Sequence, residues 1–161
     1  MGHYAMKIFL AGIIQGSIVE AKIHRQDWRG AIKEVLSRRL PDAEVYCHYS
    51  QHPQSITYDL PRLKETLEDG NRRAAGCEVL VAYLPSASMG TAIEMYEAAR
   101  HGAAVLTISP LEANWVVRAY SDRLFPDLAG LEAFLVSGEL ASLLAEKAAM
   151  REARRGKPER A

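Results

Sequence analysis

Residues 78–110 read EVLVAYLPSASMGTAIEMYEAARHGAAVLTISP, and this stretch decides the fold. The apolar run 79–84 has the length and bulk of a strand that is buried on both faces. Residues 89–101 are mostly good helix formers, Gly102 follows where a C-terminal glycine belongs, and 104–108 form a second buried strand. The stretch therefore predicts one strand-helix-strand crossover. Its loop lies at the carboxyl edge of a parallel sheet, where α/β folds bind ligands.

The rest of the chain adds strands and helices around this crossover. Further strands are predicted at 7–10, 43–49 and around 124–125, and further helices at 28–40, 61–75 and from 131 onward. Apolar residues at helical spacing give the first of these helices a core-facing stripe, made of Trp28, Ala31, Ile32, Val35 and Leu36. Leu63 and Leu67 are expected to point inward from the second. We expect a single domain over 1–161: a flavodoxin-like or Rossmann-like doubly wound α/β sheet of about five parallel strands, helices on both faces. Its charged tail, 146–161, is expected to begin as helix and to fray around 156–158.

Composition narrows the classes of function. The chain has 161 residues, 48% of them hydrophobic, and a formal net charge of +0, so no basic patch for nucleic acid or an anionic membrane is indicated. With no signal peptide and no apolar run of about 20 residues, a cytoplasmic protein is expected. The dinucleotide pattern G-x-G-x-x-G is absent, and His48 and His52 lack ligand partners at the usual spacing. We therefore expect neither a cofactor nor a metal, and we expect Cys47 and Cys77 to be reduced core thiols.

The loop and helix after residue 84 carry the candidate chemistry. Glu94 falls within the first turn and a half of the predicted helix, where unpaired N–H groups favour negative charge, so we expect it to be ionised. Gly90 and Ala98, four residues before and after it on the same face, leave room for a ligand. The alternative is that Thr91 and Glu94 form a capping box at the helix start.

The run LPSASMGTAIEMYEAARHGAAVL, together with FLAG at 9–12, resembles the nucleoside 2-deoxyribosyltransferase family. It is most similar to the branch that hydrolyses 2'-deoxynucleoside 5'-monophosphates, and the resemblance covers about residues 6–136. It implies that Glu94 is the nucleophile and that Ser88, six residues earlier, distinguishes nucleotides from nucleosides. The short Gly-Thr-x-x-Glu pattern also resembles the phosphoribohydrolases that release cytokinin bases.

The resemblance implies further substrate-binding residues near the first strand. The loop from Gly12 to Ser17, which includes Gly16, would hold the ribosyl phosphate, and Gly12 and Gly90 would let backbone approach the substrate. Phe9 and Gln15 occupy substrate-binding positions where that branch usually has a tyrosine and an arginine.

Two further segments are assigned by the same resemblance. Asp69 matches an aspartate that orients the sugar or the nucleophile, with a surface role as the alternative. In related proteins a neighbouring subunit completes each site, and the corresponding positions here are Asn114 and Arg118, the latter with helix-surface placement as its alternative. A homodimer or larger homo-oligomer is therefore expected.

Together these observations predict an enzyme of nucleotide metabolism that cleaves the N-glycosidic bond of a (deoxy)nucleoside or its 5'-monophosphate. Departure of the base leaves positive charge on the sugar, which a carboxylate at Glu94 would stabilise or bond to covalently. Attack by water on the intermediate gives hydrolysis, and attack by a second base gives transfer. Two alternatives remain open: a non-catalytic nucleotide-sensing module on the same fold, and a ribonucleotide phosphoribohydrolase.

Overall fold

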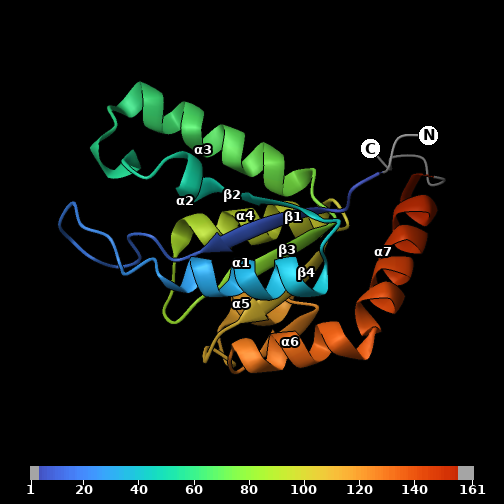
Figure 1. Cartoon of the computed structure of the whole chain (residues 1–161). Helices are drawn as coiled ribbons and strands as arrows, with labels where there is room; N and C mark the ends of the chain where they lie inside the picture. The colour runs from blue at the N-terminus through green and yellow to red at the C-terminus, as the bar shows by residue number, and fades with distance from the viewer. Residues whose placement is uncertain (1–3, 156–161) are drawn as a thin grey trace.

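The computed structural model describes residues 4–155, which form one parallel five-stranded sheet with helices on both faces (Figure 1). The strands are β1 (Lys7–Gly12), β2 (Glu44–Cys47), β3 (Val79–Tyr83), β4 (Ala104–Ile108) and β5 (Arg123–Phe125). The helices are α1 (Trp28–Arg39), α2 (His48–Gln51), the 3-10 turn η1 (Ser55–Thr57), α3 (Leu60–Ala75), α4 (Met89–Arg100), α5 (Trp115–Tyr120), α6 (Leu128–Ser137) and α7 (Glu139–Arg155).

The strand order β2-β1-β3-β4-β5 confirms the flavodoxin-like doubly wound arrangement. The order reverses between β1 and β3, and these two strands pair in parallel up to Gly12 beside Tyr83. Ligands of open α/β sheets bind at the carboxyl ends of such a strand pair. The fold thus directs attention to the loops that follow Gly12 and Tyr83.

Alternating strand residues build two apolar layers, one on each face of the sheet. Ile8 and Leu10 of β1 pack with α1, α6 and α7, whereas Phe9 and Ala11 pack with α3, α4 and α5. The central strands are buried almost completely, as expected for a parallel sheet covered on both sides. Each face of β1 is therefore fixed by a different set of helices.

Several element boundaries differ from the sequence prediction. The second strand stops at Cys47, and the next four residues turn into α2. The last predicted helix begins earlier, at Leu128, and is broken at Gly138, whose φ of 80° is readily adopted only by glycine. Residues 156–158, where fraying was expected, lie outside the described part of the chain.

Helix α7 lies at the end of the sheet where the strands begin, and polar side chains attach it there. Arg151 donates a hydrogen bond to the carbonyl of Gly102 at 3.0 Å, and Lys147 forms an ion pair with Asp122 at 2.6 Å. Within residues 4–155 no single helix is long and apolar enough to cross a membrane. Only α6 and α7 together have the length and composition of such a helix, and they are bent by 78° relative to each other.

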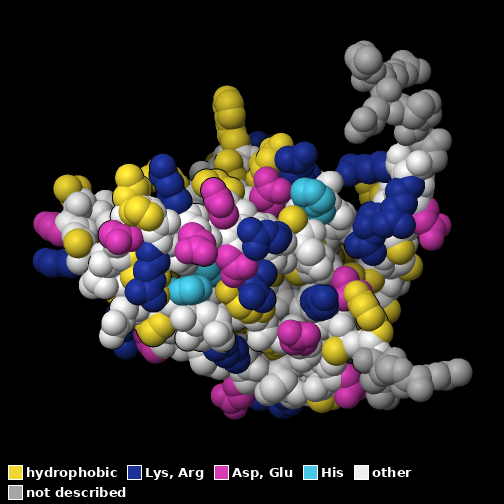
Figure 2. Space-filling model, turned by 90° about the horizontal axis from the view of Figure 1, so that it is seen from above, with side chains coloured by type: hydrophobic (Ala, Val, Ile, Leu, Met, Phe, Trp, Pro, Cys, Tyr) yellow, Lys and Arg dark blue, Asp and Glu magenta, His cyan; other side chains and the backbone are white. Residues whose placement is uncertain are grey.

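Charged side chains of both signs are mixed over the face of the molecule that carries α3 (Figure 2). Neither sign dominates the visible surface, in keeping with the formal net charge of +0. This face therefore presents no extended basic field of the kind that binds a polyanion.

Candidate active site

The loop after β3 is held by the start of α4. Ser88 is the N-cap residue, and its hydroxyl oxygen accepts hydrogen bonds from the Thr91 backbone N–H at 3.5 Å and from the Thr91 hydroxyl at 3.1 Å. The capping-box alternative is wrong, because the helix is capped three residues before Thr91 and Glu94 takes no part in the cap. Since Ser88 accepts both bonds, its own hydroxyl hydrogen is free to be donated to a ligand.

A cavity of about 320 Å³ opens beside Ser88, between the carboxyl ends of β3 and β4. It brings together three of the predicted site residues, Gly16, Ser88 and Asn114, on an otherwise mainly apolar wall. Asn114 also has a structural task, since its side-chain oxygen caps α5 through the N–H groups of Val116 and Val117 at 3.0 and 3.2 Å. The arrangement suits a small ligand with an apolar surface and a few polar groups.

Glu94, on α4, lies outside the lining of this cavity. It is the sixth residue of the helix and is partly buried, and within residues 4–155 its carboxyl group has no hydrogen-bond or ion-pair partner. Burial raises its pKa to about 8, and the positive charge of Arg29 offsets only part of that effect. The expectation that Glu94 is ionised is therefore wrong for the free protein at neutral pH, because tertiary packing outweighs the helix terminus.

Gly90, one turn before Glu94, borders open space. A methyl group placed on its Cα would meet nothing within 4 Å, so the protein itself does not require glycine here. Ala98, one turn after Glu94, is fully buried. The predicted room for a ligand beside Glu94 thus exists on the Gly90 side.

Arg29 on α1 is the site residue that sequence reasoning missed. Its exposed fraction is only 4%, and its guanidinium donates to the Gln26 side-chain oxygen at 2.6 Å, the Gly12 carbonyl at 3.2 Å and the Cys47 sulfur at 3.4 Å. It also lies over the Trp28 ring, 4.2 Å from the centroid. A signal was present, because Arg29 falls three residues before Ile32 and seven before Leu36, on the core-facing stripe of this helix.

Packing within the protein requires glycine both at the last residue of β1 and in the loop that follows. A Cβ on Gly12 would lie 2.9 Å from the Tyr83 carbonyl oxygen and would overlap the Trp28 ring. Gly16 has a φ of 58°, and a Cβ there would lie 2.7 Å from the Ile13 side chain. Their part in substrate binding stays a prediction.

The structure separates the remaining predicted residues from the cavity. Phe9 is 1% exposed and packs in the core, with its ring centroid 5.4 Å from that of Tyr46, so its expected contact with substrate is not available in this structure. Gln15 and Arg118 are exposed. Asp69 pairs with Arg73 at 2.8 Å and Arg72 at 3.3 Å, and the hydrogen bond from Arg73 lowers the pKa of its carboxyl group.

Aromatic and histidine side chains form a continuous row from β2 to η1. Tyr46 and His48 share a hydrogen bond of 3.1 Å, and His52 and Tyr58 share one of 3.2 Å. Between them, the His48 and His52 rings are tilted by 44° with their centroids 4.9 Å apart. Burial and the neighbouring His52 lower the pKa of His48 to about 4, so it is neutral at pH 7. No group of three metal-ligating side chains occurs in the described residues.

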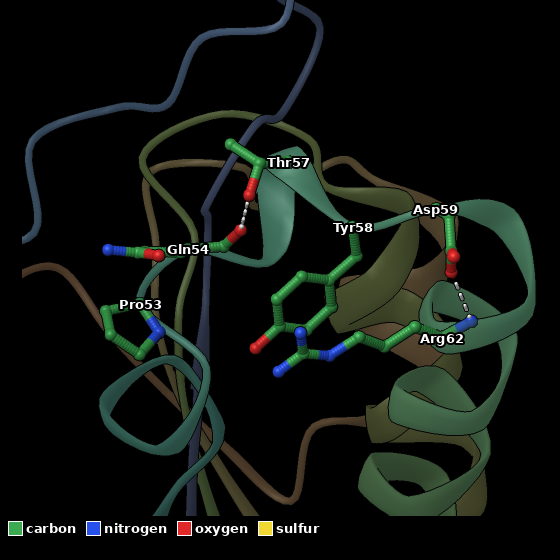
Figure 3. Close-up of a pocket in the computed structure, with 6 residues that line it drawn as sticks. All are labelled: Pro53, Gln54, Thr57, Tyr58, Asp59 and Arg62. Atoms are coloured by element: carbon green, nitrogen blue, oxygen red, sulfur yellow. Dashed lines mark hydrogen bonds between the residues drawn. The ribbon is translucent and has the colours of Figure 1, made fainter.

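A second cavity, of about 410 Å³, lies at the far end of this row (Figure 3). The Arg62 guanidinium lies 3.8 Å from the centre of the Tyr58 ring there, and Asp59 accepts a hydrogen bond from the Arg62 backbone N–H at 3.0 Å. Its lining is drawn from residues 53–62, and none of the predicted site residues belongs to it. We therefore place the candidate active site at Ser88 and Glu94.

No protein-family model matches the sequence. No curated protein matches it either. The fold is similar to that of a 2-deoxyribosyltransferase from the psychrotolerant bacterium Bacillus psychrosaccharolyticus, with a TM-score of 0.58 and 15% identity over 80% of this chain and 95% of that chain.

Two more solved structures are similar to this chain. A conserved protein from Enterococcus faecalis V583 has a TM-score of 0.57 and 15% identity over 83% of this chain and 99% of that chain. A CMP N-glycosidase from Clostridium botulinum has a TM-score of 0.47 and 17% identity over 83% and 98% of the two chains. At these identities, the similarities with TM-scores of 0.58 and 0.57 show a shared fold and no more.

Proposed function

We propose that this protein cleaves the N-glycosidic bond of a nucleoside or nucleotide, with Glu94 as the nucleophile. The observation that carries the proposal is the Glu94 carboxyl group, which is partly buried on α4 and has no hydrogen-bond or ion-pair partner among the described residues. Burial raises the pKa of this carboxyl group to about 8, and carboxyl groups with a perturbed pKa are typical of functional sites. The fold shared with a 2-deoxyribosyltransferase supports the same chemistry.

The reaction proceeds in two displacements. The ionised Glu94 oxygen attacks C1' of the sugar, the bond from C1' to the base nitrogen breaks, and the electron pair leaves with the base, which takes up a proton from water. Water then attacks C1', loses its proton to solvent and releases the carboxylate. A second base in place of water gives transfer.

The raised pKa of Glu94 gives this mechanism a pH dependence. Only the ionised form is nucleophilic, so kcat/KM should rise with pH through about 8 if Glu94 is the nucleophile. A rate that falls above pH 8 would instead indicate that Glu94 acts as an acid toward the leaving base.

The cavity beside Ser88 is proposed to receive the 5' side of the substrate. Ser88 has a free hydroxyl hydrogen with which to bind a 5'-hydroxyl or a 5'-phosphate, and apolar Leu84 and Val117 lie on the same wall. Asn114 at the rim, as in the sequence-based hypothesis, would face a second copy of the chain.

The test is a panel of ribo- and deoxyribonucleosides and their monophosphates, with free base measured by chromatography, with and without an added acceptor base. Wild-type protein should release base from at least one substrate, and Glu94→Gln should lower the rate by about a thousandfold or more. Glu97→Gln, on the same helix one turn from the site, is the matched control and should keep wild-type turnover. Equal rates for wild type and Glu94→Gln would rule out the nucleophile.

The raised pKa of Glu94 also favours a second candidate, a nucleotide-binding module without turnover, because the protonated carboxyl donates a hydrogen bond and does not attack. Calorimetry with the same panel separates the two. Binding without base release at pH 9, where Glu94 is ionised, would favour the module.

A further inference from the structure

A third cavity, of about 400 Å³, lies on the α1 side of the sheet at the carboxyl ends of β1 and β3. Its wall includes Ile13 and His24 from the loop after β1, Trp28 from α1 and Tyr83 from the end of β3. None of the described residues lines both this cavity and the one beside Ser88. Figure 1 shows the loop after β1 at the end of the sheet to which the strand arrows point.

Two residues that line this cavity carry buried polar atoms without partners. Within residues 4–155, the only side-chain nitrogen or oxygen atoms that are buried and form no hydrogen bond are His24 Nε2 and Trp28 Nε1. Leaving a buried hydrogen-bonding group unpaired is unfavourable, and most such groups in folded proteins have a partner. Both exceptions therefore direct attention to this one cavity.

The two atoms differ in what they ask of a ligand. A Cβ on Gly16 would lie 2.9 Å from His24 Nε2, so this nitrogen packs against the loop and needs no ligand contact. The indole Nε1 of Trp28 can only donate a hydrogen bond, so a molecule in the cavity would have to present an acceptor to it.

The loop after β1 is held in place without a ligand. The His24 N–H donates to the Ile14 carbonyl at 2.7 Å, and the Gln26 amide donates to the carbonyls of Ile13 and His24 at 3.0 and 2.9 Å. The Gln26 oxygen accepts a hydrogen bond from Arg29, the neighbour of Trp28, at 2.6 Å. Because these bonds hold the base of the loop, the cavity wall is largely formed in the free protein.

The walls of the cavity are aromatic and aliphatic, and its charged residues offset each other. The Trp28 and Tyr83 rings are tilted by 33° with their centroids 4.6 Å apart, and Ile13 adds an apolar side chain. Arg25 and Asp27, which also line the cavity, form an ion pair at 3.2 Å, and their side chains are 90% and 70% exposed. These walls favour an uncharged planar ring over a phosphate group.

We propose that this cavity is a second ligand site, which binds an uncharged planar heteroaromatic molecule that accepts a hydrogen bond from Trp28 Nε1. Its volume lies within the range of about 300–1,000 Å³ that small-molecule sites have. The ring of the ligand packs against Tyr83 and Ile13, and its acceptor pairs with the buried indole N–H. The site stands apart from the proposed function, because it uses none of the residues that line the cavity beside Ser88.

The test follows the indole N–H signals of Trp28 and Trp115 by ¹H–¹⁵N NMR, with Trp115→Phe assigning them. Adenine and nicotinamide are the probes, because both are uncharged heteroaromatic rings with acceptors. At least one should move the Trp28 signal downfield and to saturation, with a dissociation constant of about 1 mM or lower. Toluene, which has no acceptor, and inorganic phosphate, which has no ring, should produce no downfield shift.

A pair of leucine substitutions on α1 locates the binding. Ala31→Leu places a larger side chain at the cavity and should raise the dissociation constant about tenfold or more. Ser37→Leu, at an exposed position of the same helix outside the cavity, is the matched control and should leave it unchanged. In wild type, nuclear Overhauser effects between the ring protons of the probe and the Trp28 indole proton give a readout that needs no variant.

Three results would overturn the inference. One is a Trp28 signal that neither heteroaromatic probe moves at concentrations up to about 10 mM. Another is an undiminished shift in Ala31→Leu, which would locate the binding elsewhere, and the third is an equal downfield shift with toluene, which would show that no acceptor is needed. None of these measurements uses turnover, so failure of this inference and failure of the proposed function are distinguishable.

Discussion

At the scale of single residues, the environment of Glu94 controls what the site can do. Burial raises the pKa of this carboxyl group, and the positive charge of Arg29 lowers it by a smaller amount. The resulting pKa of about 8 leaves the carboxyl group mainly protonated at neutral pH. A substrate whose sugar becomes positive in the transition state would favour the ionised form at the moment of reaction. The same balance has a measurable effect on folding.

The free energy of unfolding should depend on pH through Glu94. Its pKa is about 8 in the folded protein against the usual 4.5, so the native state holds a proton that the unfolded chain has lost. This contribution is fully present below about pH 4.5 and disappears as the pH rises to about 8. Urea unfolding from pH 5 to 9 should show this decline in wild type, and Glu94→Gln should lack it. A parallel decline in both proteins would assign it to other groups.

Two glycines should respond oppositely to alanine. Gly12→Ala places a methyl group against Tyr83 and Trp28, and should cost about 1–3 kcal/mol in urea unfolding. The added methyl group in Gly90→Ala meets open space, so the free energy of unfolding should stay within about 1 kcal/mol of wild type. If substrate fills that space, the same variant should have lower turnover. Full activity in folded Gly90→Ala would show that the substrate lies elsewhere.

At the scale of elements, the sequence predicts the framework because the framework is local. The crossover from β3 through α4 to β4 follows from two apolar runs, a stretch of helix formers and Gly102, whose φ of 85° fits its predicted role. These signals lie within a few residues of what they determine. The doubly wound parallel sheet, its number of strands and the Cys47 and Cys77 core thiols are also confirmed.

Predictions that needed tertiary contacts were less accurate. Leu67, expected inside, is 45% exposed, and α3 instead buries Thr66, Gly70 and Ala74, small residues that let it lie close to α4. Phe9 lies in the core although its family position suggested substrate contact. Arg29 was not predicted because its hydrogen-bond partners, the Gly12 carbonyl and the Cys47 sulfur, lie at the ends of two strands that are distant from it in the sequence.

Helix α3 offers a test of Asp69. Its ion pairs with Arg72 and Arg73 are partly exposed, so Asp69→Asn should change the free energy of unfolding by less than about 1 kcal/mol. If Asp69 orients the sugar or the nucleophile, as the sequence-based hypothesis holds, turnover should still fall by about tenfold or more. Wild-type turnover in the folded variant would assign Asp69 to the surface.

At the scale of the whole molecule, exposed apolar side chains gather near the candidate site. Met89, on the cavity wall, is 82% exposed, and Trp115, at the start of α5, is 87% exposed. Where exposed apolar side chains form one contiguous patch, that patch marks a surface that binds other proteins. Met89 and Trp115 support the proposal that a second copy of the chain covers this edge.

The association is testable by light scattering after size exclusion. Wild-type protein should be a dimer or larger, and Trp115→Ser should raise the dissociation constant about tenfold or more, because a central tryptophan often dominates an interface. Val136→Ser on α6, which lies on the other face of the sheet and is 61% exposed, is the control and should leave the assembly intact. A monomeric wild type would remove the shared-site part of the proposal.

The attachment of α7 has a practical consequence. Lys147 and Arg151 hold this helix at the edge where the strands begin, so the described chain starts and finishes at the end of the sheet opposite the carboxyl ends of the strands (Figure 1). Protein immobilised through either end of the described chain, near residue 4 or residue 155, would therefore present the cavity beside Ser88 to the solution. Nucleosides could then be passed over the immobilised protein to detect binding, because the support does not block the entrance of the cavity.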